Sequence, residues 1–195
     1  MNTNEKLISL FPKPLLIIEN VFLDKLSYIE GILKEEIKVK GFKRTVSHNV
    51  DTTYHTDNKL FENKNLKFLT DFIFKSSIKF LSNLNYDEHY IKNCKYYDMW
   101  FNISYENDFL FPHHHGVSLV SGVYYVKAPK DSYINFFNHQ SPLVYHNEKF
   151  NPHTADEAKI NCIEGNLMLF KSDLIHGNKL QPKGEKIAIS FNLGI

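Results

Sequence analysis

The chain is short of arginine and of excess charge, and this excludes some classes of protein. Arg44 is the single arginine among 23 basic residues, and 22 acidic residues balance them to a formal net charge of +1. An electrostatic binder of nucleic acid or of an anionic membrane surface needs a basic excess. We therefore expect neither nucleic acid nor a membrane as a partner.

Cysteine and long apolar runs are also scarce. Cys94 and Cys162 are the two cysteines of the sequence. They are too few for a disulfide framework or a cysteine-based zinc site, so both are expected to be reduced and buried. The apolar run at 14–18 is far shorter than a membrane span. The first residues lack the pattern of a signal peptide, so a soluble cytoplasmic protein is expected.

What remains is the composition of a folded domain. Hydrophobic residues make up 43% and charged residues 23% of the 195 residues, close to the average for globular proteins. No repeat or flexible linker interrupts the chain. We expect a single domain over 1–195, with helical support and a lid loop in 1–93 and a β core in 94–195.

Two helices are predicted in the first part of the chain. Apolar residues recur at helical spacing after Asp24, which can cap the first helix, and Gly41 can end it. A second helical pattern runs from about 65 to 84, although Ser76 and Ser77 interrupt its apolar stripe. The polar segment 43–61 has no sustained period and is predicted to be a loop. Its part at 46–60 could close over an open face as a lid.

From about residue 94 the spacing of apolar residues changes from a helical repeat of 3.6 residues to the two-residue alternation of a strand. Aromatic and β-branched runs alternate with turn residues such as Gly165 and Gly184, which predicts seven or eight short strands. A mainly β (α+β) fold is therefore expected, an antiparallel sandwich or jelly roll with the helices packed on its outside. The runs are KYYDMWFNISY, SLVSGVYYVKAP, YINFFNH, GNLMLFKS and EKIAISFNLGI.

Histidine is abundant, with ten residues in the chain. If the run FPHHHG at 111–116 is extended, His113 and His115 share one face and His114 points to the other. Two imidazoles at this spacing can clamp a divalent metal, and His176, which follows an apolar strand, is the natural third ligand. A solvated H-x-H pair in a loop is the alternative. Surface loops are the better assignment for His139, His146 and His153.

The last predicted strand carries a cation on a small, polar face. Lys186 shares that face with Ala188, Ser190 and Asn192. A buried cation is costly unless an anion pairs with it. The anion is either a carboxylate of the protein or the carboxylate of a bound small acid. The opposite face is apolar: Ile187, Ile189, Phe191 and Leu193.

The order of these motifs carries a family resemblance. H-x-H, SGVYYV, GNLMLF, S-x-x-x-H and K-x-x-x-SFN together resemble the Fe(II)/2-oxoglutarate-dependent oxygenases, and most of all a small family from bacteria and phages. The similarity covers about residues 96–195. It implies a double-stranded β-helix (cupin-like) fold with Fe(II), 2-oxoglutarate and O₂. The implied activity couples oxidative decarboxylation of 2-oxoglutarate to hydroxylation of a small molecule or of an amino-acid or peptide side chain.

The resemblance also implies roles for single residues. His113, His115 and His176 become the metal ligands; His115 stands where most of the superfamily has a carboxylate, and Asp108 is the alternative if the strand register differs. Lys186 takes the far carboxylate of 2-oxoglutarate, where arginine is usual. Tyr125, Asn102 and Ser190 are expected to line the same cosubstrate pocket.

Two other functions stay open. A three-histidine cupin-type dioxygenase would not use 2-oxoglutarate, and it would not require the amine of Lys186 inside the pocket. A jelly-roll binding module or virion structural module would have no catalysis and no metal. Arg44, as the single guanidinium, could clamp an acidic substrate. Neither helical stripe requires a partner subunit, so no oligomeric state is predicted.

Overall fold

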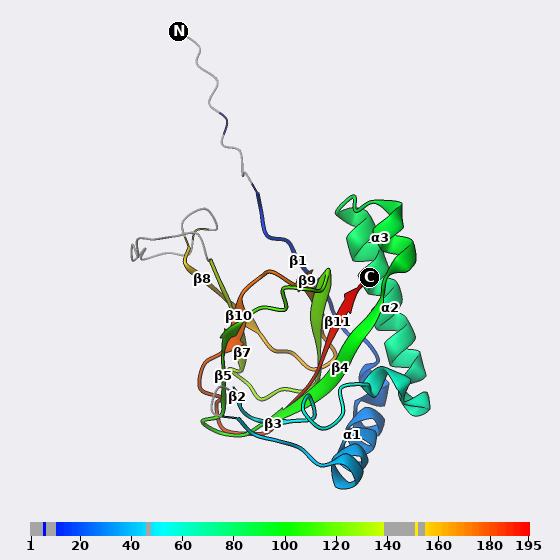
Figure 1. The fold of residues 1–195 in the computed structure, drawn as a ribbon. Helices are drawn as coiled ribbons and strands as arrows, with labels where there is room; N and C mark the ends of the chain where they lie inside the picture. The colour runs from blue at the N-terminus through cyan, green and yellow to red at the C-terminus, as the bar shows by residue number, and fades with distance from the viewer. Residues whose placement is uncertain (1–5, 7–10, 46–47, 139–150, 152–154) are drawn as a thin grey trace.

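Two antiparallel sheets face each other, and helices cover the outer side of one of them (Figure 1). The structure is a computed structural model that describes residues 6, 11–45, 48–138, 151 and 155–195. The first part of the chain supplies all three helices of these residues, and eight strands follow from residue 95 onward. This architecture confirms the predicted jelly roll with helices outside.

The larger sheet has six strands, and β11 lies at its centre between β6 and β4. β11 pairs along its whole length with β4 and over residues 187–193 with β6, so these inner residues have a partner on each side. In spatial order the strands are β1 (Leu15–Ile18), β9 (Leu167–Lys171), β6 (Val120–Lys127), β11 (Lys186–Gly194), β4 (Lys95–Ser104) and β3 (Asp51–Thr52).

The smaller sheet has five strands, with β10 at its centre between β5 and β7. Its strands are short, and β10 has three residues. In spatial order they are β2 (His48–Asn49), β5 (Phe109–His113), β10 (His176–Asn178), β7 (Tyr133–Phe137) and β8 (Glu157–Asn161).

Three helices pack on the outer face of the six-stranded sheet: α1 (Leu26–Lys40), α2 (Lys67–Asn83) and α3 (Glu88–Asn93) (Figure 1). Buried side chains of α1 and α2, such as Ile29 and Ile73, join the apolar residues Ile187, Ile189 and Phe191 of β11 in one core. A second, smaller apolar cluster lies between the two sheets and includes Ala188. The predicted alternation of faces along β11 is therefore confirmed.

The helix boundaries agree with the sequence pattern except at the first cap. Asp24 lies in a 3₁₀ turn (Leu23–Lys25) ahead of α1 and does not cap the helix, because Lys25 occupies the cap position. Gly41 ends α1 as expected, with a positive φ of 73° that suits glycine. Ser77 is fully buried, but its hydroxyl donates to the Ile73 carbonyl oxygen at 2.9 Å, so the helix continues through the polar interruption.

The segment 43–61 is not a loop throughout, which corrects the prediction. Short strands β2 and β3 lie within it, and a 3₁₀ turn at Leu60–Glu62 begins at its end. β1, β8 and α3 were also missed. Strands β1 to β3 add edge strands to both sheets, so the first part of the chain does more than cover the β core with helices.

Gly122 on β6 is a position where a side chain cannot fit. A Cβ atom there would lie 2.3 Å from Phe191 Cζ and 2.6 Å from the Met168 carbonyl oxygen. Gly122→Ala is therefore expected to lower the free energy of unfolding by about 1–3 kcal/mol, measured by urea denaturation. In the control, Gly31→Ala in α1, nothing lies within 4 Å, and better helix propensity should raise stability by about 0.5–1 kcal/mol. Equal stability of the two variants would contradict this account of the packing.

Both cysteines are free and buried, as the sequence predicts. Within the described ranges, the helices are too short or too polar to cross a membrane.

Candidate metal centre

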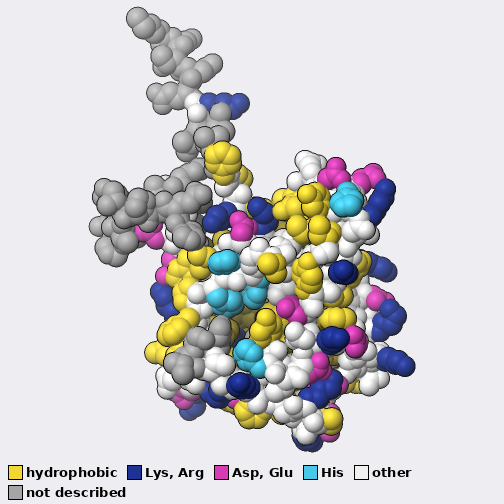
Figure 2. Space-filling view, viewed as in Figure 1, with side chains coloured by type: hydrophobic (Ala, Val, Ile, Leu, Met, Phe, Trp, Pro, Cys, Tyr) yellow, Lys and Arg dark blue, Asp and Glu magenta, His cyan; other side chains and the backbone are white. Residues whose placement is uncertain are grey.

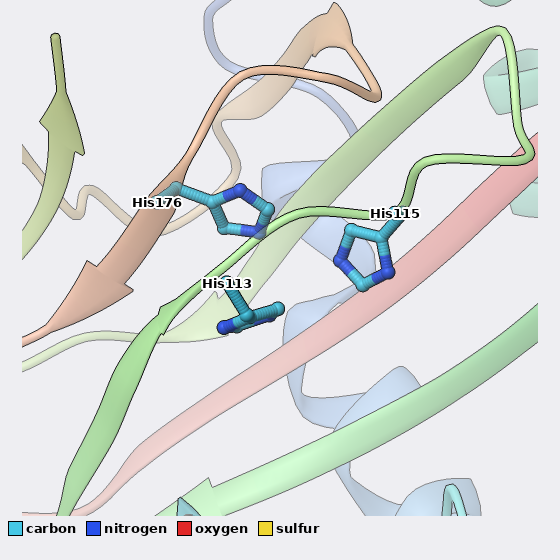
Figure 3. Close-up of side chains that lie close together, drawn as sticks. All are labelled: His113, His115 and His176. Carbon is cyan, nitrogen blue, oxygen red and sulfur yellow. The ribbon is translucent and has the colours of Figure 1, made fainter. Parts of the chain in front are cut away.

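Three histidines meet where β5 and β10 pair. His113 ends β5 and lies directly opposite His176, the first residue of β10. Directly opposed residues of an antiparallel pair place their side chains on the same face, so the two imidazoles are neighbours. His115 follows two residues beyond the end of β5, and its ring turns toward the other two (Figure 3).

The three rings are close enough to share one ion. Ring centroids are 4.6 Å apart for His113 and His176, 5.1 Å for His113 and His115, and 5.2 Å for His115 and His176. One ring nitrogen from each lies within 4.8 Å of the others. The structure thus brings together the three histidines that the sequence singled out.

Two of the rings are oriented by backbone carbonyls. His113 Nδ1 lies 2.8 Å from the Phe111 carbonyl oxygen, and His176 Nδ1 lies 2.9 Å from that of Leu174. A carbonyl only accepts, so Nδ1 carries the proton in each ring and Nε2 keeps its lone pair. A metal-binding histidine commonly has this arrangement, with the nitrogen that does not bind the ion donating to a carbonyl or carboxylate.

The protein environment also keeps these rings neutral. Burial lowers the pKa of His113, and it lowers that of His176 to about 3, with the nearby His113 acting in the same direction. Only neutral imidazole binds a metal, so both side chains are in the ligating form near neutral pH.

Asp108, the alternative ligand, does not join this cluster. Its carboxylate is buried and accepts two hydrogen bonds from Arg44, at 2.8 and 3.1 Å, and one from the Tyr105 backbone N–H at 2.8 Å. Arg44 also donates to Asp51 at 2.5 Å. Its guanidinium is therefore used by protein carboxylates, which corrects the hypothesis that it clamps an acidic substrate.

Arg44 is instead expected to stabilise the fold. Arg44→Met leaves the buried Asp108 carboxylate without its strongest partner and should lower the free energy of unfolding by about 1–3 kcal/mol. Urea denaturation of the variant, beside a Lys43→Met control at the neighbouring exposed lysine, measures the difference. If Arg44→Met unfolds at the wild-type urea concentration, the ion pair has no structural role.

A cavity of about 440 Å³ opens beside the histidines and continues between the two sheets. Histidine side chains are visible on the face of the molecule where it opens (Figure 2). All seven residues that the sequence assigned to the metal and cosubstrate sites line it: Asn102, His113, His115, Tyr125, His176, Lys186 and Ser190.

Lys186 lies in this cavity without an acidic partner. Its side chain is 2% exposed, and no carboxylate in the described part of the chain forms an ion pair with it. Asn178 Oδ1 accepts from Lys186 Nζ at 3.2 Å when the amide is oriented to donate to the Tyr133 carbonyl oxygen. Burial lowers the pKa of Lys186. A desolvated ammonium of this kind is a binding site for an anion.

Tyr125 is also buried and lines the same cavity as Lys186. Burial raises the pKa of its hydroxyl, and the neighbouring Cys162 thiol acts in the same direction. The hydroxyl therefore stays protonated and can donate a hydrogen bond. Cys162 follows β8, and nothing in the sequence pattern indicates that its thiol lies near Tyr125.

The open side of the cavity is formed by residues that the sequence did not assign. Tyr54 and Trp100 are in edge-to-face contact, with ring centroids 4.9 Å apart, and Trp100 in turn contacts His115. Thr52, Tyr54 and His55 come from the segment 46–60, of which 46–47 lie outside the described residues. A lid role for this segment stays a prediction. His139, His146 and His153 also lie outside the described residues.

The fold is that of the Fe(II)/2-oxoglutarate oxygenases. The chain is similar to a viral collagen prolyl hydroxylase from Paramecium Bursaria Chlorella virus-1 solved with 2-oxoglutarate (TM-score 0.60, 16% identity, 92% of this chain and 95% of that one). A Pseudomonas putida prolyl-4-hydroxylase is also similar (0.62, 10%, 91% and 91%), as is HygX from Streptomyces hygroscopicus with nickel and 2-oxoglutarate (0.60, 13%, 93% and 83%).

The sequence also matches a family model of this class. Residues 98–192 match the family model described as "Putative 2OG-Fe(II) oxygenase". The chain is an enzyme that uses Fe(II) and 2-oxoglutarate, as the resemblance in sequence implied. Among curated proteins, none is similar enough in sequence to count as a relative.

Proposed function

We propose that His113, His115 and His176 hold the Fe(II) of this oxygenase. The observation that carries the proposal is the convergence of three ring nitrogens within 4.8 Å at a cavity that also contains the buried Lys186. The donor set fits the ion, because imidazole is a suitable ligand for divalent iron. Burial supports the fit further by keeping His113 and His176 neutral.

Lys186 and Tyr125 are proposed to hold 2-oxoglutarate by its far carboxylate. An incoming carboxylate supplies the anion that Lys186 lacks and favours its charged form. The protonated Tyr125 hydroxyl can donate to the same group. Asn102 and Ser190 line the cavity nearby and are the further polar contacts in this proposal.

The reaction proposed is hydroxylation of a small molecule or of an amino-acid or peptide side chain. Fe(II) and 2-oxoglutarate, when bound, supply the activation of O₂ that this chemistry needs, with succinate and CO₂ as the coproducts. The chain's own residues orient the ligands through the Phe111 and Leu174 carbonyls. Buried apolar side chains such as Phe170 and Ile134 keep water away from the inner cavity.

The aromatic wall of Tyr54 and Trp100 is the proposed contact for the substrate. Tyr54 is 41% exposed at the open side of the cavity, where a substrate can reach it. A neutral or apolar group packs well against such rings. The similarity to two prolyl hydroxylases supports a peptide substrate, and the similarity to HygX, also solved with hygromycin B, supports a small molecule.

Residues 1–195 are proposed to act as one oxygenase domain, because strands from 1–93 extend both sheets. A cytoplasmic location is part of the proposal, supported by two cysteines that are both free thiols.

The decisive experiment measures succinate formation by anaerobically purified protein supplied with Fe(II) and O₂. Succinate should appear only when 2-oxoglutarate and Fe(II) are both present, either coupled to a substrate or as slow uncoupled turnover. A three-histidine dioxygenase of the cupin type would consume O₂ with its substrate independently of 2-oxoglutarate. Absence of 2-oxoglutarate turnover in both modes would overturn the proposal.

A further inference from the structure

A buried polar network surrounds Asn192 near the middle of the six-stranded sheet. Asn192 on β11 lies opposite Asp98 on β4 and opposite Ser121 on β6. Side chains of directly opposed residues lie on one face, so all three point to the interior between the sheets. Asn192 is 3% exposed and Ser121 is 1% exposed.

The carboxamide of Asn192 is held from both sides. Its Oδ1 accepts from Ser121 Oγ at 2.6 Å, and its Nδ2 donates to Asp98 Oδ1 at 2.7 Å. Ser121 Oγ is also 2.8 Å from Ser172 Oγ, which is equally buried. Buried polar groups cost free energy unless they are paired, and here each partner fixes the next.

The network contacts His115 at two points. Asn192 Nδ2 lies 3.3 Å from His115 Nδ1, and the Ser172 carbonyl oxygen accepts from the His115 backbone N–H at 2.8 Å. His115 lies two residues beyond the end of β5, so the backbone hydrogen bonds between β5 and its neighbours do not fix the position of its ring. The network therefore connects this histidine to the opposite sheet.

We infer that Asn192 is a positioning residue for His115, with Asp98 and Ser121 holding its carboxamide in place. The inference rests on the ligand set of the proposed function. His113 and His176 each have a backbone carbonyl oxygen at Nδ1, whereas the side-chain amide of Asn192 lies at Nδ1 of the third ring. As placed, the amide presents its Nδ2 donor to His115 Nδ1; turned so that Oδ1 faces the ring, it accepts from Nδ1–H and leaves Nε2 free to bind the ion.

Asp98 is the acidic residue of the network, and its carboxylate accepts a hydrogen bond from Asn192. An imidazole ligand brings no negative charge to a metal ion, whereas a carboxylate ligand does. The Asp98 carboxylate contacts the Asn192 amide, and that amide in turn contacts the His115 ring. Outer partners of this kind stabilise a metal site by orienting its ligands.

Metal affinity of the full-length chain tests the inference without relying on turnover. The metal-free protein is titrated anaerobically with Co(II), and the visible spectrum of the bound ion reports its ligand geometry. Asn192→Leu keeps the shape of the side chain and removes its hydrogen bonds. It is expected to raise the Kd for Co(II) by about 10- to 100-fold and to change the spectrum. The control Ser77→Ala removes a buried hydroxyl from α2, far from the site, and should leave both unchanged.

A double-mutant cycle separates positioning from general destabilisation. His115→Ala should weaken Co(II) binding strongly, and adding Asn192→Leu to it should cause little further loss. The same factor of loss with and without His115, or wild-type affinity in Asn192→Leu, would overturn the inference. Wild-type affinity in His115→Ala would instead overturn the ligand set, and the inference with it.

A second variant keeps the test open should Asn192→Leu not fold. Asp98→Ala leaves the amide in place and removes the carboxylate that orients it. We expect a severalfold weaker Co(II) affinity, again only while His115 is present. An unchanged Kd in a folded Asp98→Ala protein would show that the carboxylate does not act on the site.

Discussion

His176→Ala is expected to abolish metal binding and the turnover of 2-oxoglutarate. Changes in the surroundings of a metal ligand commonly cost about 10- to 100-fold in affinity, so loss of a ligand should cost more than about 100-fold. His176 is also the most buried of the three histidines and lies at the centre of the smaller sheet. Titration with Fe(II) or Co(II), followed by a succinate assay, measures both effects.

The matched control is His89→Ala, which removes an exposed imidazole from α3. It should leave metal affinity and succinate formation at the wild-type level. Because His176 packs against Phe170, the variant should also be checked for folding by circular dichroism. A folded His176→Ala protein that binds metal with wild-type affinity would refute the proposed centre.

Lys186→Met is expected to change cosubstrate binding and stability in opposite directions. Loss of the charged hydrogen bond should raise the Kd for 2-oxoglutarate by about 10- to 100-fold, since such bonds contribute about 1.5–3 kcal/mol. Without 2-oxoglutarate, the variant should be more stable than the wild type by on the order of 1 kcal/mol, because an unpaired buried ammonium is costly. Calorimetric titration and urea denaturation measure the two effects.

The stability difference should also depend on pH in a defined direction. Burial lowers the pKa of Lys186 in the folded state below its usual 10.5. Between the two values the unfolded chain binds more protons, so the stability of the wild type rises with pH in that window. The advantage of Lys186→Met should therefore be largest below the folded-state pKa and disappear as the pH approaches 10.5.

Lys183→Met is the matched control, since Lys183 is an exposed lysine a few residues ahead of β11. It should change neither the Kd for 2-oxoglutarate nor the stability in a measurable way. A Lys186→Met protein that binds 2-oxoglutarate as tightly as the wild type would place the cosubstrate anchor elsewhere.

The period of apolar residues was enough to predict most of the architecture. Long strands with alternating faces, such as β4 and β11, and helices with a continuous apolar stripe, such as α1, have a strong local signal. β8, with the sequence EAKIN, was missed because glutamate, alanine and lysine are depleted in strands. Strands of two residues, such as β2 and β3, have no period at all.

The histidines and Lys186 were found because their signal is local or chemically unusual. An H-x-H pair and a lysine on a small polar face are visible in a single sequence. The partners of Arg44 were not, because Asp108 lies 64 residues away and only the fold brings the two together. Asn192 was placed on the correct face of its strand, but its contacts with Asp98 and Ser121 depend on strand register, which a single sequence does not determine.

The central position of β11 has a consequence for how the protein is made. β11 follows every other strand of the described chain, yet it separates β4 and β6 in the sheet. Until residues 186–194 leave the ribosome, β4 and β6 each have an unpaired edge, and neither Lys186 nor Asn192 is present. The nascent chain is thus exposed to edge-to-edge aggregation late in synthesis, and a chain that stops before residue 186 can build neither the sheet nor the cosubstrate pocket.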